Sequence, residues 1–361
     1  ADSTLTVDGD ANFIVKGVGP DVTVDADGDS GGGDTPLAGT LNVTTDAGAS
    51  GVEVLTGARA TTVDTQTGAP DGDVTVHALE LLDDELLGIS GDAAAVVDDL
   101  IGDLDASAMS DGALRVNTGD NAADANNDGV IDLALGDTAA TVVTAGSGDT
   151  VNVDAAAMAG GTSGSGDLTL AGSSKVVVTD LLVDLDADGF AESDGSLVGA
   201  LTGELEVTTG QLQDPGNDID SVVFTLGEGA TSVTANEDPD NSGENIDLTL
   251  EGAALTGSAL TVDGDADVRV NDLATDLTAS SLTGILDVNA AADQGEHSVV
   301  TGSGRTTITG ASGTTLNVDS AQLASDGTVD ADNAELVIDG SAGTINVTAV
   351  ERDVDASSFS G

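Results

Sequence analysis

The residues best suited to chemistry lie in one aspartate-rich stretch, VDLDADGFAESDG, at positions 183–195. Its candidate ligands are Asp184, Asp186, Asp188, Glu192 and Asp194. An EF-hand-type loop wraps calcium with oxygen ligands at its first, third, fifth and ninth positions, and a glycine at the sixth makes the sharp turn; Gly189 fits that place. Neither flank has the pattern of a helix. The stretch therefore predicts a calcium loop at a turn between strands.

Three further stretches combine alternating oxygen ligands with glycine, at residues 124–132, 238–247 and 25–34. Their candidate ligands are Asp124, Asn126, Asp128 and Asp132 in the first, Asp238, Asp240, Ser242 and Glu244 in the second, and Asp25, Asp27, Asp29 and Asp34 in the third. In the first, Leu135 stands where a bidentate Glu would close an EF-hand. Alternatively, Asp and Gly are simply good turn formers on an acidic surface. Together the stretches favour several calcium ions; magnesium fits less well because it requires tight octahedral geometry.

Composition also favours cations as partners. The 361 residues include 66 Asp plus Glu and only seven Lys plus Arg, giving a formal net charge of −59. Nucleic acid and anionic membrane surfaces would repel such a chain. The sequence also has no run of about 18 apolar residues, so we expect no membrane insertion. Because 39% of the residues are hydrophobic, the chain can still bury a core, and we expect it to be folded.

The residue types on which enzymes depend are scarce. There is no cysteine, Trp or Tyr, and the two histidines, His77 and His297, lie far apart without a metal-ligand spacing. We expect both histidines to be strand or turn residues. We therefore predict no catalytic site.

An internal repeat organises the whole chain. Five segments share a marker glycine followed by a marker aspartate, 12 residues later in four copies and 13 in the fifth. The marker glycines are Gly9, Gly91, Gly172, Gly264 and Gly340, and the marker aspartates are Asp21, Asp103, Asp184, Asp276 and Asp353. We divide one continuous array into units of about 4–84, 85–165, 166–257, 258–333 and 334–361, the last truncated.

The repeat predicts an all-β fold of very short strands. In the fourth copy, apolar alternations occur at 260–262, 268–270, 286–288, 299–300, 306–308 and 316–318. Two architectures fit: a parallel β-solenoid, in which each coil pairs with the next around a stacked apolar core, or a string of calcium-dependent β-sandwiches. Sandwich cores normally use a large aromatic anchor, and this chain has only four Phe. The pattern therefore favours the solenoid, with its Asp/Gly-rich loops at coil corners.

With the repeats and loops in place, the chain resembles the large acidic, cysteine-free repeat proteins of bacterial type I secretion, namely calcium-dependent surface-layer proteins and giant RTX-type adhesins. The DLDAS-containing repeats carry the resemblance, together with GSGDTVNVD at 146–154, a degenerate relative of the RTX nonapeptide. That nonapeptide is not repeated in tandem, so the resemblance does not extend to an RTX β-roll. It implies export of the unfolded chain, folding on contact with external calcium, and a structural role at the cell surface.

We therefore expect a structural extracellular protein that self-assembles through its solenoid ends into a homo-oligomer, lattice or filament, with a cell-surface polysaccharide as a further partner. One alternative is the stalk or ligand-binding region of a large secreted adhesin, which would form monomeric rods. Another is a halophile surface protein, in which acidic residues hold water and salt. Stability in a halophile protein should respond to molar monovalent salt, whereas the predicted loops should respond to calcium.

Overall fold

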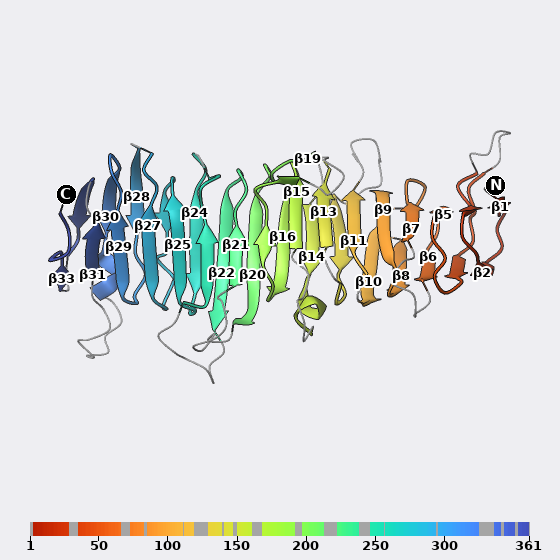
Figure 1. The fold of residues 1–361 in the computed structure, drawn as a ribbon, viewed down its shortest axis with the longest axis horizontal. Coiled ribbons are helices and arrows are strands. Elements are labelled where there is room, and N and C mark those ends of the chain that lie inside the picture. The colour runs from red at the N-terminus through yellow and green to blue at the C-terminus, as the bar shows by residue number, and fades with distance from the viewer. Residues whose placement is uncertain are drawn as a thin grey trace. The chain divides into compact units, whose positions relative to one another are not determined.

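Short strands separated by turns make up most of the chain in the computed structural model, and their long ladders are parallel (Figure 1). The structure describes residues 3–28, 35–65, 73–82, 85–110, 112–118, 129–138, 141–146, 150–160, 168–191, 197–212, 222–237, 246–255, 257–293, 295–324, 336–340, 343–350 and 353–360. Two compact units, Ala1–Thr179 and Asp180–Gly361, divide the chain, and each is a parallel β-solenoid.

In the first unit the chain alternates between two sheets, one strand at a time. The first sheet contains β1 (Ser3–Thr6), β3 (Val22–Asp25), β5 (Val52–Leu55), β7 (Asp73–His77), β9 (Ala94–Leu100), β11 (Leu114–Thr118), β13 (Thr141–Ala145) and β15 (Leu168–Gly172). The second contains β2 (Phe13–Val18), β4 (Leu41–Thr45), β6 (Thr61–Thr65), β8 (Leu86–Gly91), β10 (Asp103–Met109), β12 (Val130–Ala134), β14 (Thr150–Asp154) and β16 (Lys175–Leu181). A short 3₁₀ helix, η1 (Ala156–Gly160), follows β14.

The second unit repeats this alternation. One sheet contains β17 (Leu185–Asp186), β21 (Val222–Thr225), β23 (Leu248–Glu251), β25 (Val268–Leu273), β27 (Leu286–Ala290), β29 (Thr306–Gly310), β31 (Leu336–Gly340) and β33 (Val354–Asp355). The other contains β20 (Leu205–Leu212), β22 (Thr231–Glu237), β24 (Leu260–Gly264), β26 (Leu277–Thr278), β28 (Glu296–Val300), β30 (Thr315–Asp319) and β32 (Thr344–Thr348). An antiparallel hairpin of β18 (Phe190–Ala191) and β19 (Leu197–Val198) and a 3₁₀ helix, η2 (Ala321–Ala324), lie outside these sheets.

The core consists of apolar side chains stacked in register from coil to coil. Inward positions alternate with outward ones, so parallel pairing places each inward residue directly over the next. One column in the first unit contains Val54, Val76, Val97, Val116, Val143 and Leu170. One in the second contains Phe224, Leu250, Val270, Val288, Ile308 and Ile338. The parallel ladders confirm the predicted β-solenoid, because β-sandwiches are antiparallel.

The sequence repeat corresponds to an odd number of strands. Among the described residues, successive marker glycines are separated by the seven strands β2–β8, β9–β15 and β25–β31. The third copy has the corresponding seven, with the β18–β19 hairpin inserted. Because two strands make one coil, a repeat spans three and a half coils. Within each unit, consecutive copies therefore begin in opposite sheets.

The marker glycines are required by backbone geometry. All five have positive φ, between 95° and 112°, where residues with a Cβ are strained. Four of them also lie against the neighbouring coil: a Cβ on Gly172 or Gly264, for example, would collide with the carbonyl oxygen of Ala145 or Ala235, whereas no atom lies within 4 Å of a Cβ built on Gly9. In the last four copies, the marker glycine therefore allows the backbones of adjacent coils to approach closely.

A second position in each repeat is also left-handed, four residues before the marker aspartate. Asp99, Asp180 and Asp272 occupy it with φ of 56°, 57° and 49°, and Gly17 and Ala349 occupy it in the outer copies. In β9 and β25 the strand register shifts at this point, as in a β-bulge. Aspartate tolerates this conformation better than most residues because its short polar side chain bonds locally.

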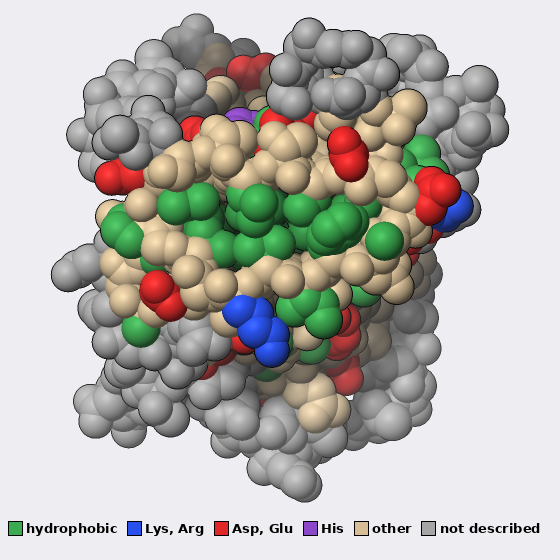
Figure 2. Space-filling view, turned by 90° about the vertical axis from the view of Figure 1, so that its right-hand side faces the viewer, with side chains coloured by type: hydrophobic (Ala, Val, Ile, Leu, Met, Phe, Trp, Pro, Cys, Tyr) green, Lys and Arg blue, Asp and Glu red, His purple; other side chains and the backbone are tan. Residues whose placement is uncertain are grey.

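The first unit exposes apolar side chains at the end formed by β1 and β2. Among the described residues, each of these strands pairs on one side only, with β3 and β4. Leu5, which pairs with the buried Val24, is 42% exposed, and the inward residues of β2, Phe13 and Val15, are only half-buried. Figure 2 looks onto this end and shows a band of hydrophobic side chains across it. Among the described residues, no further coil covers the stacked core here.

Candidate metal-binding loops

The third-copy stretch is centred on the two-residue strand β17. Asp184 precedes this strand, Asp186 ends it and Asp188 follows shortly before β18. All three side chains are at least partly exposed, as expected for a coil corner. Glu192 and Asp194 lie outside the described residues.

Asp184 has a structural partner. Its Oδ1 accepts the backbone N–H of Val223, on the next coil of the same sheet, at 2.8 Å. The marker aspartates of two other copies do the same: Asp103 Oδ1 accepts from Asp132 N at 3.0 Å, and Asp276 Oδ1 accepts from Ser298 N at 2.7 Å. The marker aspartate therefore joins neighbouring coils whether or not an acidic insertion follows it, and in Asp184 only the other oxygen remains for a cation.

Asp186 and Asp188 form the part of the loop with the chemistry of a cation site. Asp186 Oδ1 accepts the backbone N–H of Asp188 at 3.2 Å. Burial, a hydrogen bond with Asp186 and repulsion from that carboxylate together raise the pKa of Asp188. The folded loop therefore brings two carboxylates together at an energetic cost, which a divalent cation would remove.

Most ligands of the other three stretches lie outside the described residues: Asp124, Asn126, Asp128, Asp238, Asp240, Ser242, Glu244, Asp29 and Asp34. Of the remaining three, Asp25 ends β3 and is only 6% exposed, unlike the solvent-facing ligand expected at a coil corner. Asp27 follows it. Asp132 lies in the middle of β12, where its Oδ1 accepts from Asn152 Nδ2 at 2.8 Å. Within the described part, none of these three stretches assembles a set of ligands.

An outward-facing groove of about 560 Å³ on β8–β16 was not foreseen from the sequence. Its rim carries Asp103, Asp105, Asp132 and Asp154, one or two from each of three adjacent strands, and Leu86, Ala134 and Val177 add apolar surface. These carboxylates are far apart in the sequence and become neighbours only through coil-to-coil register. Knowledge of that register would have been needed to find the groove.

The donor chemistry of the third-copy loop fits calcium, since all its candidate ligands are carboxylate oxygens. Asp186, Asp188 and one oxygen of Asp184 would contribute from the described part. Within the ranges that the structure describes, no three His, Asp or Glu side chains come close enough to hold a metal ion. In that same part of the chain, no helix has the length and hydrophobicity of a membrane span.

Comparisons with known family models, curated proteins and solved structures give no match to this chain.

Proposed function

We propose that the protein is a calcium-stabilised structural component of the cell surface or extracellular matrix, exported by type I secretion, that self-assembles through its solenoid ends. The observation that carries this proposal is the open core at β1 and β2. An exposed apolar core beside unpaired strand edges is a template for another chain, and proteins that remain monomeric usually protect such edges.

The last strands of the second unit are similarly exposed. Inward residues of β32 are only half-buried, and Val350 and Val354 are 50% and 39% exposed. The strands β32 and β33 each pair on one side among the described residues. We propose that such an end binds a second copy of the chain, which would extend both parallel sheets and bury the apolar side chains.

Calcium would stabilise the folded chain by binding between carboxylates that repel one another in its absence. The Asp186–Asp188 pair supports this role. With a net charge of −59, most other charged side chains also repel one another, although each repulsion is weaker. Because an ion that binds only the folded state adds to its stability, the chain would remain expanded in a calcium-poor cytoplasm and fold outside. A cell-surface polysaccharide is the further partner that we propose for the assembled form.

A calcium titration of the chelated chain tests this proposal, with circular dichroism for β structure and light scattering and electron microscopy for assembly. We expect β signal first and then filaments or a lattice. The variants Leu5→Asp and Val15→Asp, at inward positions of β1 and β2, should fold with calcium but remain monomeric. Leu79→Asp is the matched control, because Leu79 is 59% exposed outside the strands.

Two results would contradict the proposal. If the chain is equally folded and monomeric in chelator, the acidic loops are only turns. If Leu79→Asp prevents assembly as effectively as Leu5→Asp, association is general hydrophobic aggregation and the end of the solenoid has no special role.

A second candidate, the ligand-binding stalk of an adhesin, is favoured by the groove on β8–β16. A groove lined by both carboxylates and apolar side chains suits a ligand better than a flat strand face does. In that case the chain stays monomeric in calcium, and Asp105→Asn or Asp154→Asn weakens ligand binding without changing the fold. Ultracentrifugation in calcium distinguishes the two functions.

A further inference from the structure

Two threonine hydroxyls are buried without a partner. Thr56 and Thr301 are both 0% exposed, and neither Oγ1 forms a hydrogen bond within the described part of the chain. Among the described residues, they are the only buried hydroxyls of which this is true. Burying an unpaired hydroxyl is costly, and most such groups in proteins bind either the protein or an ordered water.

The two threonines occupy the same corner in different copies of the repeat. Thr56 follows β5 and Thr301 follows β28, whereas Leu135 and Leu226 follow the corresponding strands β12 and β21 of the second and third copies. A glycine comes next in all four copies. The leucines are as buried as the threonines, at 1% and 0% exposed. Leucine therefore fills this corner in two copies, and threonine stands there in the other two.

Small residues lie above and below each of these corners. Parallel register places Thr56 between Ala26 and Ala78. The neighbours in the other copies are Ala106 and Ala155 for Leu135, Ala187 and Gly252 for Leu226, and Ala279 and Ser320 for Thr301. Because threonine lacks the δ carbons of leucine and its neighbours are similarly small, it leaves space for a molecule of about the size of water.

Carbonyl oxygens beside Thr56 can bind such a molecule. A Cβ built on the following residue, Gly57, would meet the carbonyl oxygens of Leu37 and Ala26 at 2.6 and 3.2 Å, so both oxygens lie at this corner. Each accepts one backbone N–H, and a carbonyl oxygen has a second lone pair.

The corner at Thr301 has the same arrangement. Its carbonyl oxygens belong to Leu282 and Ala279, and each again accepts one backbone N–H. Ser320, stacked on Thr301, adds a hydroxyl that donates to the Thr348 carbonyl at 3.0 Å and can still accept a hydrogen bond.

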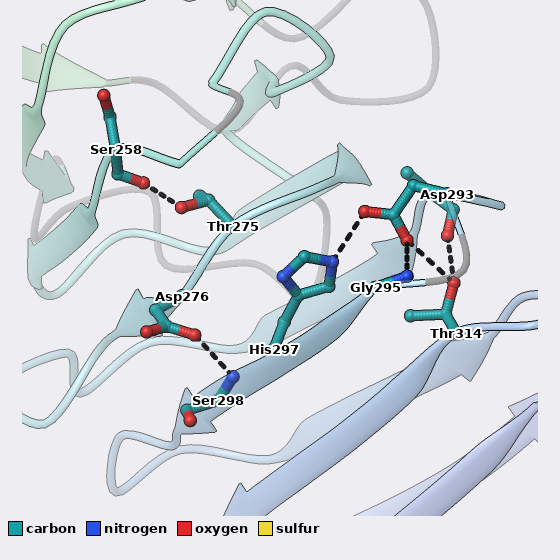
Figure 3. Close-up of polar contacts among 9 residues, drawn as sticks. Ser258, Thr275, Asp276, Asp293, Gly295, His297, Ser298 and Thr314 are labelled. Atoms are coloured by element: carbon teal, nitrogen blue, oxygen red, sulfur yellow. Dashed lines mark hydrogen bonds and ion pairs between the residues drawn. The ribbon is translucent and has the colours of Figure 1, made fainter.

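Buried hydroxyls on the coils that flank Thr301 do have partners within the protein. Thr275, before β26, donates to the Ser258 carbonyl (Figure 3). Thr314, before β30, donates to the Ala291 carbonyl. The unpaired hydroxyl is therefore specific to the corner and is not a general property of these coils.

The imidazole on β28 also has a partner. His297, a strand residue as the sequence predicts, contacts Asp293 Oδ2 through Nε2 at 2.7 Å (Figure 3). Burial alone would raise the pKa of Asp293, but hydrogen bonds from Gly295 N–H, His297 and Thr314 lower it overall. In the described part of the second unit, only Thr301 thus has a buried hydroxyl without a partner.

We propose that each of the two threonine corners binds one buried water molecule through the threonine hydroxyl. Water accepts from Oγ1 and donates to the carbonyl oxygens, so it satisfies the hydroxyl and fills the space that leucine occupies in the other copies. The groups named at these corners are uncharged, which suits water better than a metal ion. Neither threonine belongs to the acidic stretches or to the solenoid ends, so the proposal does not depend on calcium binding or assembly.

Oxygen-17 magnetic relaxation dispersion of the solvent tests the proposal on the full chain in millimolar calcium, because its amplitude measures the number of waters held inside a protein. A folded chain of this length is expected to hold roughly a dozen, so variants are compared under identical conditions. Thr56→Val and Thr301→Val keep the side-chain shape and remove the hydroxyl. Each should lower the amplitude by one water, and the double variant by two.

Matched variants separate the corner from other hydration. Leu226→Thr creates a threonine corner in the third copy and should add one water. Thr307→Val, at an outward position of β29, is the control and should leave the amplitude unchanged. Circular dichroism reports whether each variant is folded. If Thr301→Val does not fold, Thr301→Leu, which copies the corner of the third copy, replaces it and should also remove one water.

Urea midpoints provide a second measurement. With water bound, Thr56→Val and Thr301→Val leave carbonyl oxygens without a donor, so their midpoints should fall relative to Thr307→Val. In a dry corner the same changes would remove an unpaired buried hydroxyl, and the midpoints would rise.

Three results would overturn the proposal. An unchanged amplitude with raised midpoints in both corner variants would mean that the hydroxyls are dry. A folded Leu226→Thr that gains no water would mean that the shape of the corner does not retain one. A loss in Thr307→Val equal to that in the corner variants would assign the signal to surface hydration.

Discussion

Asp103 Oδ1 accepts the backbone N–H of Asp132 at 3.0 Å, so a side chain of one coil binds the main chain of the next. Asp103→Ala removes this bond and should lower the free energy of unfolding by about 1 kcal/mol. The change also removes one negative charge from a chain that repels itself, which opposes the loss. Asp98→Ala isolates that charge effect, because among the described residues the Asp98 side chain has only a distant contact with His77, at 3.9 Å. Urea midpoints should fall for Asp103→Ala relative to Asp98→Ala; equal midpoints would show that the coil-joining bond contributes nothing.

The marker glycines give a sharper test of the coil geometry. Gly264→Ala forces a Cβ into positive φ and against the Ala235 carbonyl, so it should destabilise the second unit by more than about 1 kcal/mol. Gly199→Ala should have little effect, since no atom lies within 4 Å of a Cβ built there. Thermal unfolding of both variants in calcium compares them. A midpoint for Gly264→Ala equal to that of Gly199→Ala would mean that the coils are not packed as described.

Asp188 should oppose folding in chelator and favour it in calcium. Its pKa is raised in the fold, so the stability associated with the protonated form is present at acid pH and is lost as pH rises through the folded pKa. At pH 7 in chelator, Asp188→Asn should therefore unfold at a slightly higher urea concentration than the natural chain. In calcium the order should reverse, because a ligand is missing. An unchanged order in calcium would argue against an ion at this loop.

Asp293 behaves in the opposite sense. Its pKa is lowered in the fold, so its contribution to stability is present above the unfolded pKa, about 3.9, and is lost as pH falls through the folded value. Asp293→Asn should cost about 1 kcal/mol at pH 7, and the difference from the natural chain should shrink below pH 4. Asp263→Asn, in β24, removes the same charge elsewhere in the second unit and is the control. A difference between Asp293→Asn and the natural chain that is independent of pH would mean that the carboxylate charge is not involved.

Much of the fold could be predicted because the repeat sets strand spacing. The alternations expected in the fourth copy all lie in strands, from β24 to β30. The two-residue strand β26 was missed, because Leu277 and Thr278 are too short a run to alternate. The positive φ angles of Asp99, Asp180 and Asp272 were also missed. Aspartate is common throughout this chain, so composition does not indicate which aspartates adopt a left-handed backbone.

The candidate loops show where sequence spacing is insufficient. Asp184 matches the first position of a calcium loop, yet Asp103 and Asp276 occupy the same place in copies without that insertion. This recurrence could have signalled the structural bond to the next coil. The groove on β8–β16 depends on register between strands about 20 to 30 residues apart, and a single sequence does not fix that register.

Because each repeat spans three and a half coils, its features appear on both broad sides of a solenoid unit. Within each unit, copies that differ by seven strands exchange sheets, so a side chain that projects from one broad side in one copy projects from the other in the next. Two consecutive copies are therefore enough to place the same surface feature on both broad sides. Adding or deleting a single repeat would therefore move every later copy to the opposite broad side of its unit.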